Sequence, residues 1–503
     1  MTMRTGRLDR VAGVMVGLAC GDALGAAYEF GGPYSADMPV EMKGGGAFGW
    51  EPGEWTDDTS MAIPLLELIA SGERPRGYKL RSAVKRWIEW MEDAKDVGTQ
   101  TSAVLSEAKL ASNGDFYELD SAAGAAAKKY QQQHPNAAGN GSLMRTAPYG
   151  LVGQDLRYIA DTAAGQSKLT HPHDDATTAC AIWSAAIGHA VDTGQLDVRV
   201  GLRATVSESG QGALYALWES RIEEAESFLP EHFTKNGWVV QALQGAWSAI
   251  VHSGDRAAND PDHVRRALQI AVRGGGDTDT VAAIAGGLIG AAYGVSAIPL
   301  GWKRRIHGWP GWRSEELVEH AVTAQRIWSE TGAPDLRAWP AIDRLDYSGW
   351  RRTETCVRHP HDSGVFLGGV GVLDRLPEAV DAVVSLCRIG RRQIPDSVPR
   401  EDRVAVWLID SDDPDDNQHL DFVLTEAADM VAELRGEGKT VFVHCVQAHS
   451  RTPTVGALYS VRHLGMSAEA AVRDIVSALP DARPNSAFCS AIRRIAEERF
   501  SDV

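Results

Sequence analysis

The sequence predicts a multidomain protein in which an all-α domain is followed by an α/β domain built on a mostly parallel sheet. The first observation is length, because 503 residues exceed the usual size of one domain. The second is a spacing of three or four residues between small or apolar side chains across the Ala- and Gly-rich residues 7–330. The third is the alternation of short β-branched runs with helical stretches in residues 355–503.

Four segments of the first domain carry the helical period most clearly, and β-branched alternation is nearly absent around them. These segments are 60–71, 176–191, 263–275 and 280–294. The abundant Ala and Gly would permit close packing of these helices. Residues 331–354 then lose the period and contain two prolines, so we expect the linker there.

The second domain is predicted to alternate strands with helices. The β-branched runs expected to form strands are 364–373, 379–389, 403–410 and 440–445. The helices are expected at 418–436, 452–463, 467–478 and 486–499. Because helical crossovers join parallel strands, this order indicates a mostly parallel sheet.

The composition limits the partners. A net charge of −17 argues against a nucleic-acid backbone or an anionic membrane as the main partner. No apolar run reaches the length of roughly 18 residues that a transmembrane helix needs. The first apolar run is broken by Gly21 and Asp22, so no signal peptide is predicted. Six scattered cysteines favour a reducing compartment, and we expect a cytoplasmic protein.

Two short clusters of aspartate and threonine distinguish the first domain, "GEWTDDTS" and "RGGGDTDTVAA", while Glu29 ends the first apolar segment. Adjacent buried carboxylates repel one another, and a hard divalent cation with oxygen ligands offsets that repulsion. Each cluster alone is more typical of a helix N-cap. Two clusters together with Glu29 favour a two-metal site.

Five stretches in the first domain resemble the ADP-ribosylglycohydrolase family, which includes the dinitrogenase reductase-activating glycohydrolase. They occur in the family's order and are "GVMVGLACGDALGAAYEF", "GEWTDDTSMA", "GNGSLMRTAPYGL", "LTHPHDDATTACAIW" and "GGGDTDTVAAIAGGLIGAAYG". The resemblance implies an all-α fold and hydrolysis of the glycosidic bond of ADP-ribose. The implied substrate is an ADP-ribosylated protein, with arginine favoured, or a small molecule that contains ADP-ribose.

The same resemblance implies the site residues. Two divalent cations, Mg²⁺ or Mn²⁺, would be held by Thr56, Asp57, Asp58, Asp277, Asp279 and Thr280. Glu29 would ligate or assist the attack of water. The ADP-ribose pocket would be lined by Asn140, Gly141, Ser142 and His171, with His173 as the alternative histidine.

The second domain carries "VFVHCVQAHSRTPTVG", in which Cys445 follows a predicted strand and Arg451 opens a predicted helix. A helix N-terminus favours a thiolate and binds phosphate oxygens, and an arginine grips two such oxygens. His444 and Thr452 would tune the thiolate. This setting is expected to support chemistry on a phosphorylated substrate.

Residues 355–500 resemble the dual-specificity and tyrosine phosphatase family on this loop and on the opening strands. The family's general acid would lie in "LIDSDDPDDN", where Asp412 is favoured over Asp410 and Asp413. Ala448 departs from the glycine usual in the family. Two functions therefore stay open for this domain, a phosphatase acting on a phosphate ester and a non-catalytic module that binds phosphate or a partner.

Overall fold

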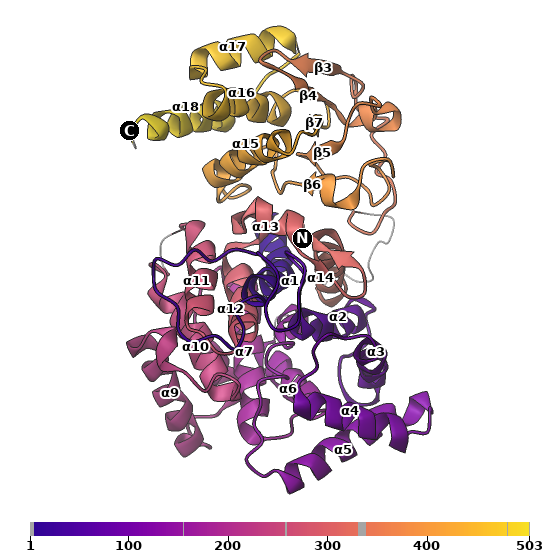
Figure 1. Cartoon of the computed structure of the whole chain (residues 1–503), viewed down its shortest axis with the longest axis vertical. Helices are drawn as coiled ribbons and strands as arrows, with labels where there is room; N and C mark the ends of the chain where they lie inside the picture. The colour runs from indigo at the N-terminus through magenta and orange to yellow at the C-terminus, as the bar shows by residue number, and fades with distance from the viewer. Residues whose placement is uncertain (1–4, 154, 257–258, 330–338, 480, 502–503) are drawn as a thin grey trace. The chain divides into compact units, whose positions relative to one another are not determined.

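The computed structural model describes residues 5–153, 155–256, 259–329, 339–479 and 481–501 (Figure 1). The chain divides into two compact units. The first unit comprises Arg7–Ile298 and the segment that begins at Arg305, and the second comprises Pro299–Arg304 and the chain from Trp339 onward. The predicted linker 331–354 stays a prediction, because 331–338 lie outside the described residues. Residues 339–354 contain no helix or strand.

The first unit is mostly helical, as predicted. Its only described strands are the two-residue pair β1 (His307–Gly308) and β2 (Trp312–Arg313), which are antiparallel. Its helices are α1 (Thr5–Gly25), α2 (Asp57–Ala70), α3 (Arg81–Met91), α4 (Thr99–Ala111), α5 (Leu119–Gln133), α6 (Leu156–Ser167), α7 (Asp174–Thr193), α8 (Val198–Thr205), α9 (Gly212–Ser227), α10 (Val239–His252), α11 (Asp262–Arg273), α12 (Thr278–Tyr293) and α14 (Ser314–Trp328).

Glycines let α1 and α12 touch backbone to backbone. A Cβ at Gly17 would lie 2.3 Å from the carbonyl oxygen of Gly286, and one at Gly13 would lie 2.1 Å from that of Gly290. At the end of α1, a Cβ at Gly25 would lie 2.4 Å from the Cα of Asp279. Contacts this short exclude any larger residue. The antiparallel packing therefore brings the end of α1 against the start of α12.

The second unit contains a five-stranded sheet in the order β3-β4-β7-β5-β6. Its strands are β3 (Cys356–His359), β4 (Asp362–Gly369), β5 (Ala382–Ser385), β6 (Arg403–Ala405) and β7 (Val441–Cys445). The pairs among β4, β7, β5 and β6 are parallel, and β3 runs antiparallel to β4 at the edge. The mostly parallel sheet is confirmed. Strand β3 was missed because it has only four residues, of which Val357 is the only β-branched one, so it shows no apolar alternation.

Four long helices accompany this sheet and agree with the predicted ranges to within a few residues. They are α15 (Leu420–Gly436), α16 (Arg451–His463), α17 (Ala468–Ala478) and α18 (Ser486–Ser501), and Figure 1 shows them gathered at one side of the strands. The short α13 (Leu300–Arg305) lies mostly within the second unit's share of the chain. Strand β7 is buried throughout, so Cys445 at its end lies inside the second unit.

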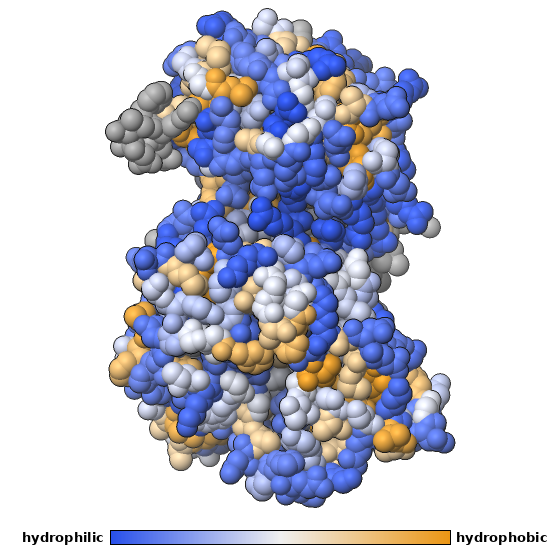
Figure 2. All heavy atoms as spheres, viewed as in Figure 1, coloured by the Kyte–Doolittle hydropathy of each residue, from blue (hydrophilic) through white to orange (hydrophobic). Residues whose placement is uncertain are grey.

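The visible face in Figure 2 is mainly hydrophilic on each unit, with apolar residues scattered among polar ones. Within the described ranges, every helix is too short or too polar to cross a membrane. All six cysteines are free thiols.

Candidate functional site

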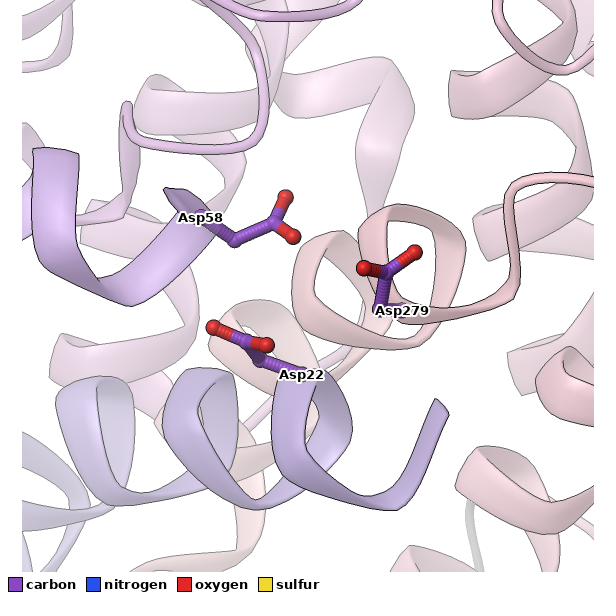
Figure 3. Close-up of side chains that lie close together, drawn as sticks. All are labelled: Asp22, Asp58 and Asp279. Carbon is purple, nitrogen blue, oxygen red and sulfur yellow. The ribbon is translucent and has the colours of Figure 1, made fainter. Parts of the chain in front are cut away.

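Carboxylates from three helices converge at one place in the first unit. Asp22 lies in the last turn of α1, Asp58 in the first turn of α2 and Asp279 in the first turn of α12. Their side chains point toward one another in Figure 3, and an oxygen of each lies within 4.8 Å of the others. All three are buried, so water screens their repulsion poorly.

A second acidic group shares Asp279. Glu29, Asp277 and Asp279 also offer oxygens within 4.8 Å of one another. Glu29 and Asp277 are only partly buried, so this group is closer to solvent than the first. Two neighbouring oxygen clusters with a common carboxylate are the arrangement that the prediction of two divalent cations calls for, and the prediction itself stays untested.

Asp22 holds the start of α2 in place. One of its oxygens accepts from the backbone N–H of Thr56 at 2.8 Å. The other accepts from the backbone N–H of Thr59 at 2.9 Å and from its hydroxyl at 2.6 Å. These bonds satisfy orphan donors at the helix N-terminus. Asp22 was not among the predicted site residues, although its interruption of an apolar helix was the available signal.

Burial raises the pKa of every carboxyl group in this cluster, and repulsion from neighbouring carboxylates adds to the rise except at Asp22 and Asp277. The pKa of Glu29 rises to about 9 because of burial and the nearby charges of Asp277 and Asp96. Burial raises the pKa of Asp22 to about 6. Burial and neighbouring aspartates also raise the pKa values of Asp57, Asp58 and Asp279. The cluster thus disfavours its own ionised form in the absence of added positive charge.

The residues present fit a hard divalent cation. The buried oxygens Asp58 Oδ1 and Glu29 Oε2 have no hydrogen-bond partner among the described residues. Across the described ranges, none of the cluster's carboxylates forms an ion pair with a lysine or arginine. The N-termini of α2 and α12 contribute only about half a positive charge each. Carboxylate and hydroxyl oxygens are the ligands that Mg²⁺ and Mn²⁺ prefer.

All six residues predicted as metal ligands lie in this cluster. The hydroxyl of Thr56 donates to Asp58 Oδ2 at 3.1 Å and lies 3.4 Å from Asp57 Oδ1. The backbone N–H of Thr280 donates to Asp279 Oδ1 at 2.9 Å. Their ligation of a metal stays a prediction. The cluster also includes Asp96, which the sequence did not single out and whose charge reaches Glu29 and Asp57.

Asn140 connects the acidic cluster to the predicted ADP-ribose pocket. Its Nδ2 donates to Asp277 Oδ2 at 2.7 Å and to the carbonyl oxygen of Asn236 at 2.9 Å. Asn236 in turn accepts from the backbone N–H of Asp277 and donates to the carbonyl oxygen of Gly275. Asn236 is buried and was not among the predicted site residues. An isolated asparagine before a helix is typical of a turn, so its sequence context gave no sign of a role in the site.

His171 faces the turn that contains Gly141. A Cβ at Gly141 would lie 2.9 Å from His171 Cε1 and 3.2 Å from its Nε2, so glycine is required there. The alternative His173 instead caps α7, where its Nδ1 accepts from the backbone N–H of Asp175 at 3.1 Å. The hydroxyl of Ser142 is fully buried 2.8 Å from that of Ser167, so its side chain is directed into the core.

Glu29 is followed by a strained residue. Phe30 has φ +63°, a left-handed conformation that costs a residue with a Cβ about 1–2 kcal/mol. The backbone N–H of Phe30 donates to the carbonyl oxygen of Gly276 at 2.7 Å, which ties the strained turn to the loop before Asp277. The Phe30 ring is 66% exposed while Glu29 faces inward. We expect this left-handed turn to contribute to the direction of the Glu29 carboxylate.

The loop between β7 and α16 in the second unit has the form of an anion cradle. Among the described residues, no backbone N–H from 446 to 451 donates a hydrogen bond to a protein group. Ala448 adopts φ +57° in the middle of this loop and is 2% exposed. Consecutive free N–H groups at a helix N-terminus form a binding site for an anion.

Arg451 lies at the start of α16 beside this loop. Its Nη1 donates to the carbonyl oxygens of Leu386 at 2.8 Å and Leu408 at 3.2 Å. Its Nε lies 3.7 Å from Asp410 Oδ2. Asp412, the favoured general acid, caps α18, where its Oδ1 accepts from the Ser486 hydroxyl at 2.9 Å and from the backbone N–H of Ala487, and its role as the acid stays a prediction. Asp410 is thus the aspartate nearest to the arginine.

The two remaining predicted residues of the second unit are fully buried behind the loop. His444 Nε2 lies 2.8 Å from the hydroxyl of Ser385 on the neighbouring strand, and burial lowers its pKa to about 4. The hydroxyl of Thr452 donates to the carbonyl oxygen of Gly368 at 3.3 Å. Both side chains bind the sheet rather than the space in front of Cys445.

A solved structure of human DUSP28 resembles the second unit. It is 26% identical and covers 29% of this chain and 95% of that chain, with a TM-score of 0.25. This similarity is too low to assign an activity.

The first unit has closer counterparts. ADP-ribosylarginine hydrolase Tri1 of Pseudomonas putida (strain GB-1) is 28% identical over 305 residues, which are 59% of this chain and 74% of that protein. A solved structure named "ADP-ribosylglycohydrolase-related protein complex" is 31% identical, with a TM-score of 0.50, and covers 64% of this chain and 99% of that chain. The family model for ADP-ribosylglycohydrolase matches residues 3–334. Because this match spans more than half of the sequence, the chain belongs to the ADP-ribosylglycohydrolase family.

Proposed function

We propose that the first unit is a divalent-cation-dependent hydrolase that removes ADP-ribose from modified arginine side chains of proteins. The observation that carries the proposal is the pair of acidic groups that share Asp279 and contact Asn140 through Asp277. The arginine linkage is proposed because the relative from Pseudomonas putida is named as an ADP-ribosylarginine hydrolase.

The reaction joins a water oxygen to the anomeric carbon of the ribose while the bond from that carbon to the guanidine nitrogen breaks. Bound Mg²⁺ or Mn²⁺ would orient the ribose hydroxyls and activate the water. The ligands proposed for the two ions are Thr56, Asp57, Asp58, Asp277, Asp279 and Thr280, with Asp22 keeping the start of α2 in register. Glu29 would carry a proton between the water and the leaving nitrogen.

The remaining parts of the substrate have a place beside this centre. The turn at Gly141 would face the diphosphate and its ribose, because free backbone donors in a tight turn suit anionic oxygens, and Asn140 would hold this turn beside Asp277 through its Nδ2. Trp238 pairs through its backbone with Gly139 and exposes 37% of its surface. Its flat indole offers a stacking surface for adenine.

A panel of ADP-ribosides tests this function. Protein substrates modified on arginine, on serine, and free ADP-ribosylarginine are incubated with the full chain in Mg²⁺, in Mn²⁺ and in a chelator. We expect release of ADP-ribose from both arginine substrates, and loss of that release in the chelator. Release that survives chelation, or release from serine alone, would contradict the proposal.

For the second unit, we propose hydrolysis of a phosphate ester. Free N–H groups from 446 to 451 would bind the phosphate oxygens, and Cys445 Sγ would attack the phosphorus. The ester P–O bond breaks as an aspartate protonates the leaving oxygen, and water then releases phosphate from the cysteine. Asp410 is our candidate acid because it lies at Arg451, whereas Asp412 caps α18.

A binding module is the second candidate for this unit. The guanidinium of Arg451 already donates to two backbone carbonyls, and Ala448 places a Cβ in the loop where glycine is usual. Hydrolysis of p-nitrophenyl phosphate by the wild type and by Cys445→Ser distinguishes the two functions. A phosphatase loses turnover in Cys445→Ser and still binds the inhibitor vanadate or phosphate. A binding module shows no turnover in either protein and equal phosphate affinity in both.

The general acid is separable by mutation. Asp410→Asn should slow turnover of an ester with a poor leaving group more than one with a good leaving group, while Asp412→Asn should act only through the stability of α18. The reverse result would restore Asp412 as the acid.

A further inference from the structure

Arg145 is a buried cation without a buried anion. It is 0% exposed, and across the described residues it forms no ion pair with a carboxylate. Its Nε donates to Gln166 Oε1 at 3.0 Å, and the guanidinium lies 4.1 Å from the centre of the Trp87 ring. Burial lowers its pKa only to about 10, so it stays charged at neutral pH. Burying a charged guanidinium carries a large desolvation penalty, which suggests that this charge has a function.

One further contact of Arg145 is directed toward the predicted pocket, while its Nη1 lies 3.8 Å from Met61 Sδ. Its Nη2 donates to the Thr170 hydroxyl at 2.7 Å, and that hydroxyl lies 2.8 Å from Nδ1 of His171. Arginine can only donate, so the Thr170 oxygen is the acceptor in the first bond. The single hydroxyl proton of Thr170 then points to His171 Nδ1, which is the acceptor in reach.

This direction determines the tautomer of His171. A neutral imidazole whose Nδ1 accepts a hydrogen bond carries its proton on Nε2. Burial and the charge of Arg145 lower the pKa of His171 to about 3, so the ring is neutral. Two bonds to Ser167 fix the backbone of His171, through its N–H at 2.7 Å and its carbonyl oxygen at 2.8 Å.

The Nε2 edge of the His171 ring faces the turn formed by residues 139–141. Nε2 has no hydrogen-bond partner among the described residues, and the ring lies where a Cβ on Gly141 would clash. His171 is buried, with 3% of its surface exposed. An unpartnered donor so placed is available to an oxygen of a ligand bound at the turn.

We propose that Arg145 and Thr170 are positioning residues that hold His171 as a neutral Nε2–H donor to an oxygen of bound ADP-ribose. The proposal rests on the ADP-ribose pocket of the proposed function. It assigns to Arg145 a role at a ligand that it does not touch. The oxygen concerned belongs to the diphosphate or to a ribose hydroxyl, both of which accept such a bond.

Nitrogen NMR of the histidine rings tests the relay without any ligand. In the full chain labelled with ¹⁵N-histidine, His171 is assigned from its loss in His171→Gln. We expect an unprotonated Nδ1 and a protonated Nε2 in the wild type. Thr170→Val, which keeps the shape and removes the hydroxyl, should shift the ring toward the Nδ1–H form. Thr170→Ser should restore the wild-type spectrum. An Nδ1–H ring in the wild type would overturn the proposal, even if Thr170→Val fails to fold.

Calorimetry with ADP-ribose supplies the second readout. Thr170→Val should weaken binding about tenfold, the loss of one hydrogen bond, and Thr170→Ser should recover the affinity. Equal affinity in Thr170→Val with a changed tautomer would overturn the link to the ligand. If the wild type binds no ADP-ribose, the proposed function of the pocket fails, and the NMR result still decides whether the relay exists.

Discussion

The two units build their candidate sites at helix N-termini and give them opposite charge. In the first unit, the starts of α2 and α12 and the end of α1 gather carboxylates, and the partial positive charge of two helices is too small to balance them. In the second unit, the start of α16 adds its free N–H groups to the guanidinium of Arg451. In the proposed functions, the same backbone feature therefore serves a cation site where acids surround it and an anion site where they do not.

The largest effect is expected at Asp279, because both acidic groups share its carboxylate. Asp279→Asn removes one charge from each proposed ion site while keeping the shape of the side chain. Loss of the several kcal/mol that metal-assisted catalysis supplies should lower the release of ADP-ribose by about 1000-fold. Mg²⁺ and Mn²⁺ affinity by calorimetry should fall with it.

The exposed Asp37 provides the matched control, because Asp37→Asn makes the same chemical change on the surface of the first unit. It should leave cation affinity and turnover unchanged. Full cation affinity in Asp279→Asn would remove the two-ion interpretation.

The stability of the second unit should depend on pH through His444. Burial lowers the pKa of His444 to about 4, below the usual value of 6.5 for histidine. Between these values the unfolded chain binds a proton that the folded unit does not, so stability falls as pH falls from about 6.5 to 4. The loss approaches about 3 kcal/mol for this one group.

Pulse proteolysis in urea measures the stability of each unit separately, because the two units give different fragments. His444→Gln should flatten the pH profile of the second unit between pH 4 and 6.5 and leave the profile of the first unit unchanged. An unchanged slope in His444→Gln would mean that another group causes the acid sensitivity.

The sequence predicted the parts of the first site that are adjacent in the chain and missed those that are isolated. The pairs of aspartate and threonine at 56–59 and 277–280 are visible because polar residues crowd a glycine-rich turn. Asp22, Asp96 and Asn236 are single residues, and only the packing of α1 on α12 and the loop bonds bring them to the cluster. No local sequence pattern predicts packing between residues so far apart in the chain.

The second unit shows the same limit in a different form. Its helices and the central strands were predicted from apolar period, and the loop from the order of strand, cysteine and arginine. The sequence favoured Asp412 over Asp410 and Asp413 without access to the bonds that direct Asp412 to α18, because those bonds join residues 74 and 75 positions apart. The local sequence therefore shows that this loop contains several aspartates, whereas the direction of each carboxylate depends on tertiary contacts.

The smallest expected effect concerns the two left-handed residues, one in each site. Ala448 at φ +57° is a buried core residue, so Ala448→Gly relieves the left-handed strain of about 1–2 kcal/mol but removes one buried methyl group and adds flexibility to the unfolded chain. The net result should be a second unit more stable by up to about 1 kcal/mol, measured by pulse proteolysis.

Phe30→Gly provides the matched case in the first unit. It relieves the same strain at φ +63° but removes a ring that packs edge-to-face on Phe48 at 6.1 Å, so its gain should be smaller than that of Ala448→Gly. The backbone that aims Glu29 is kept by glycine, and turnover should survive. Phe30→Ala keeps the strain without the ring and should be the least stable of the three. If Phe30→Ala matches Phe30→Gly, the left-handed turn stores no strain and the direction of Glu29 has another cause.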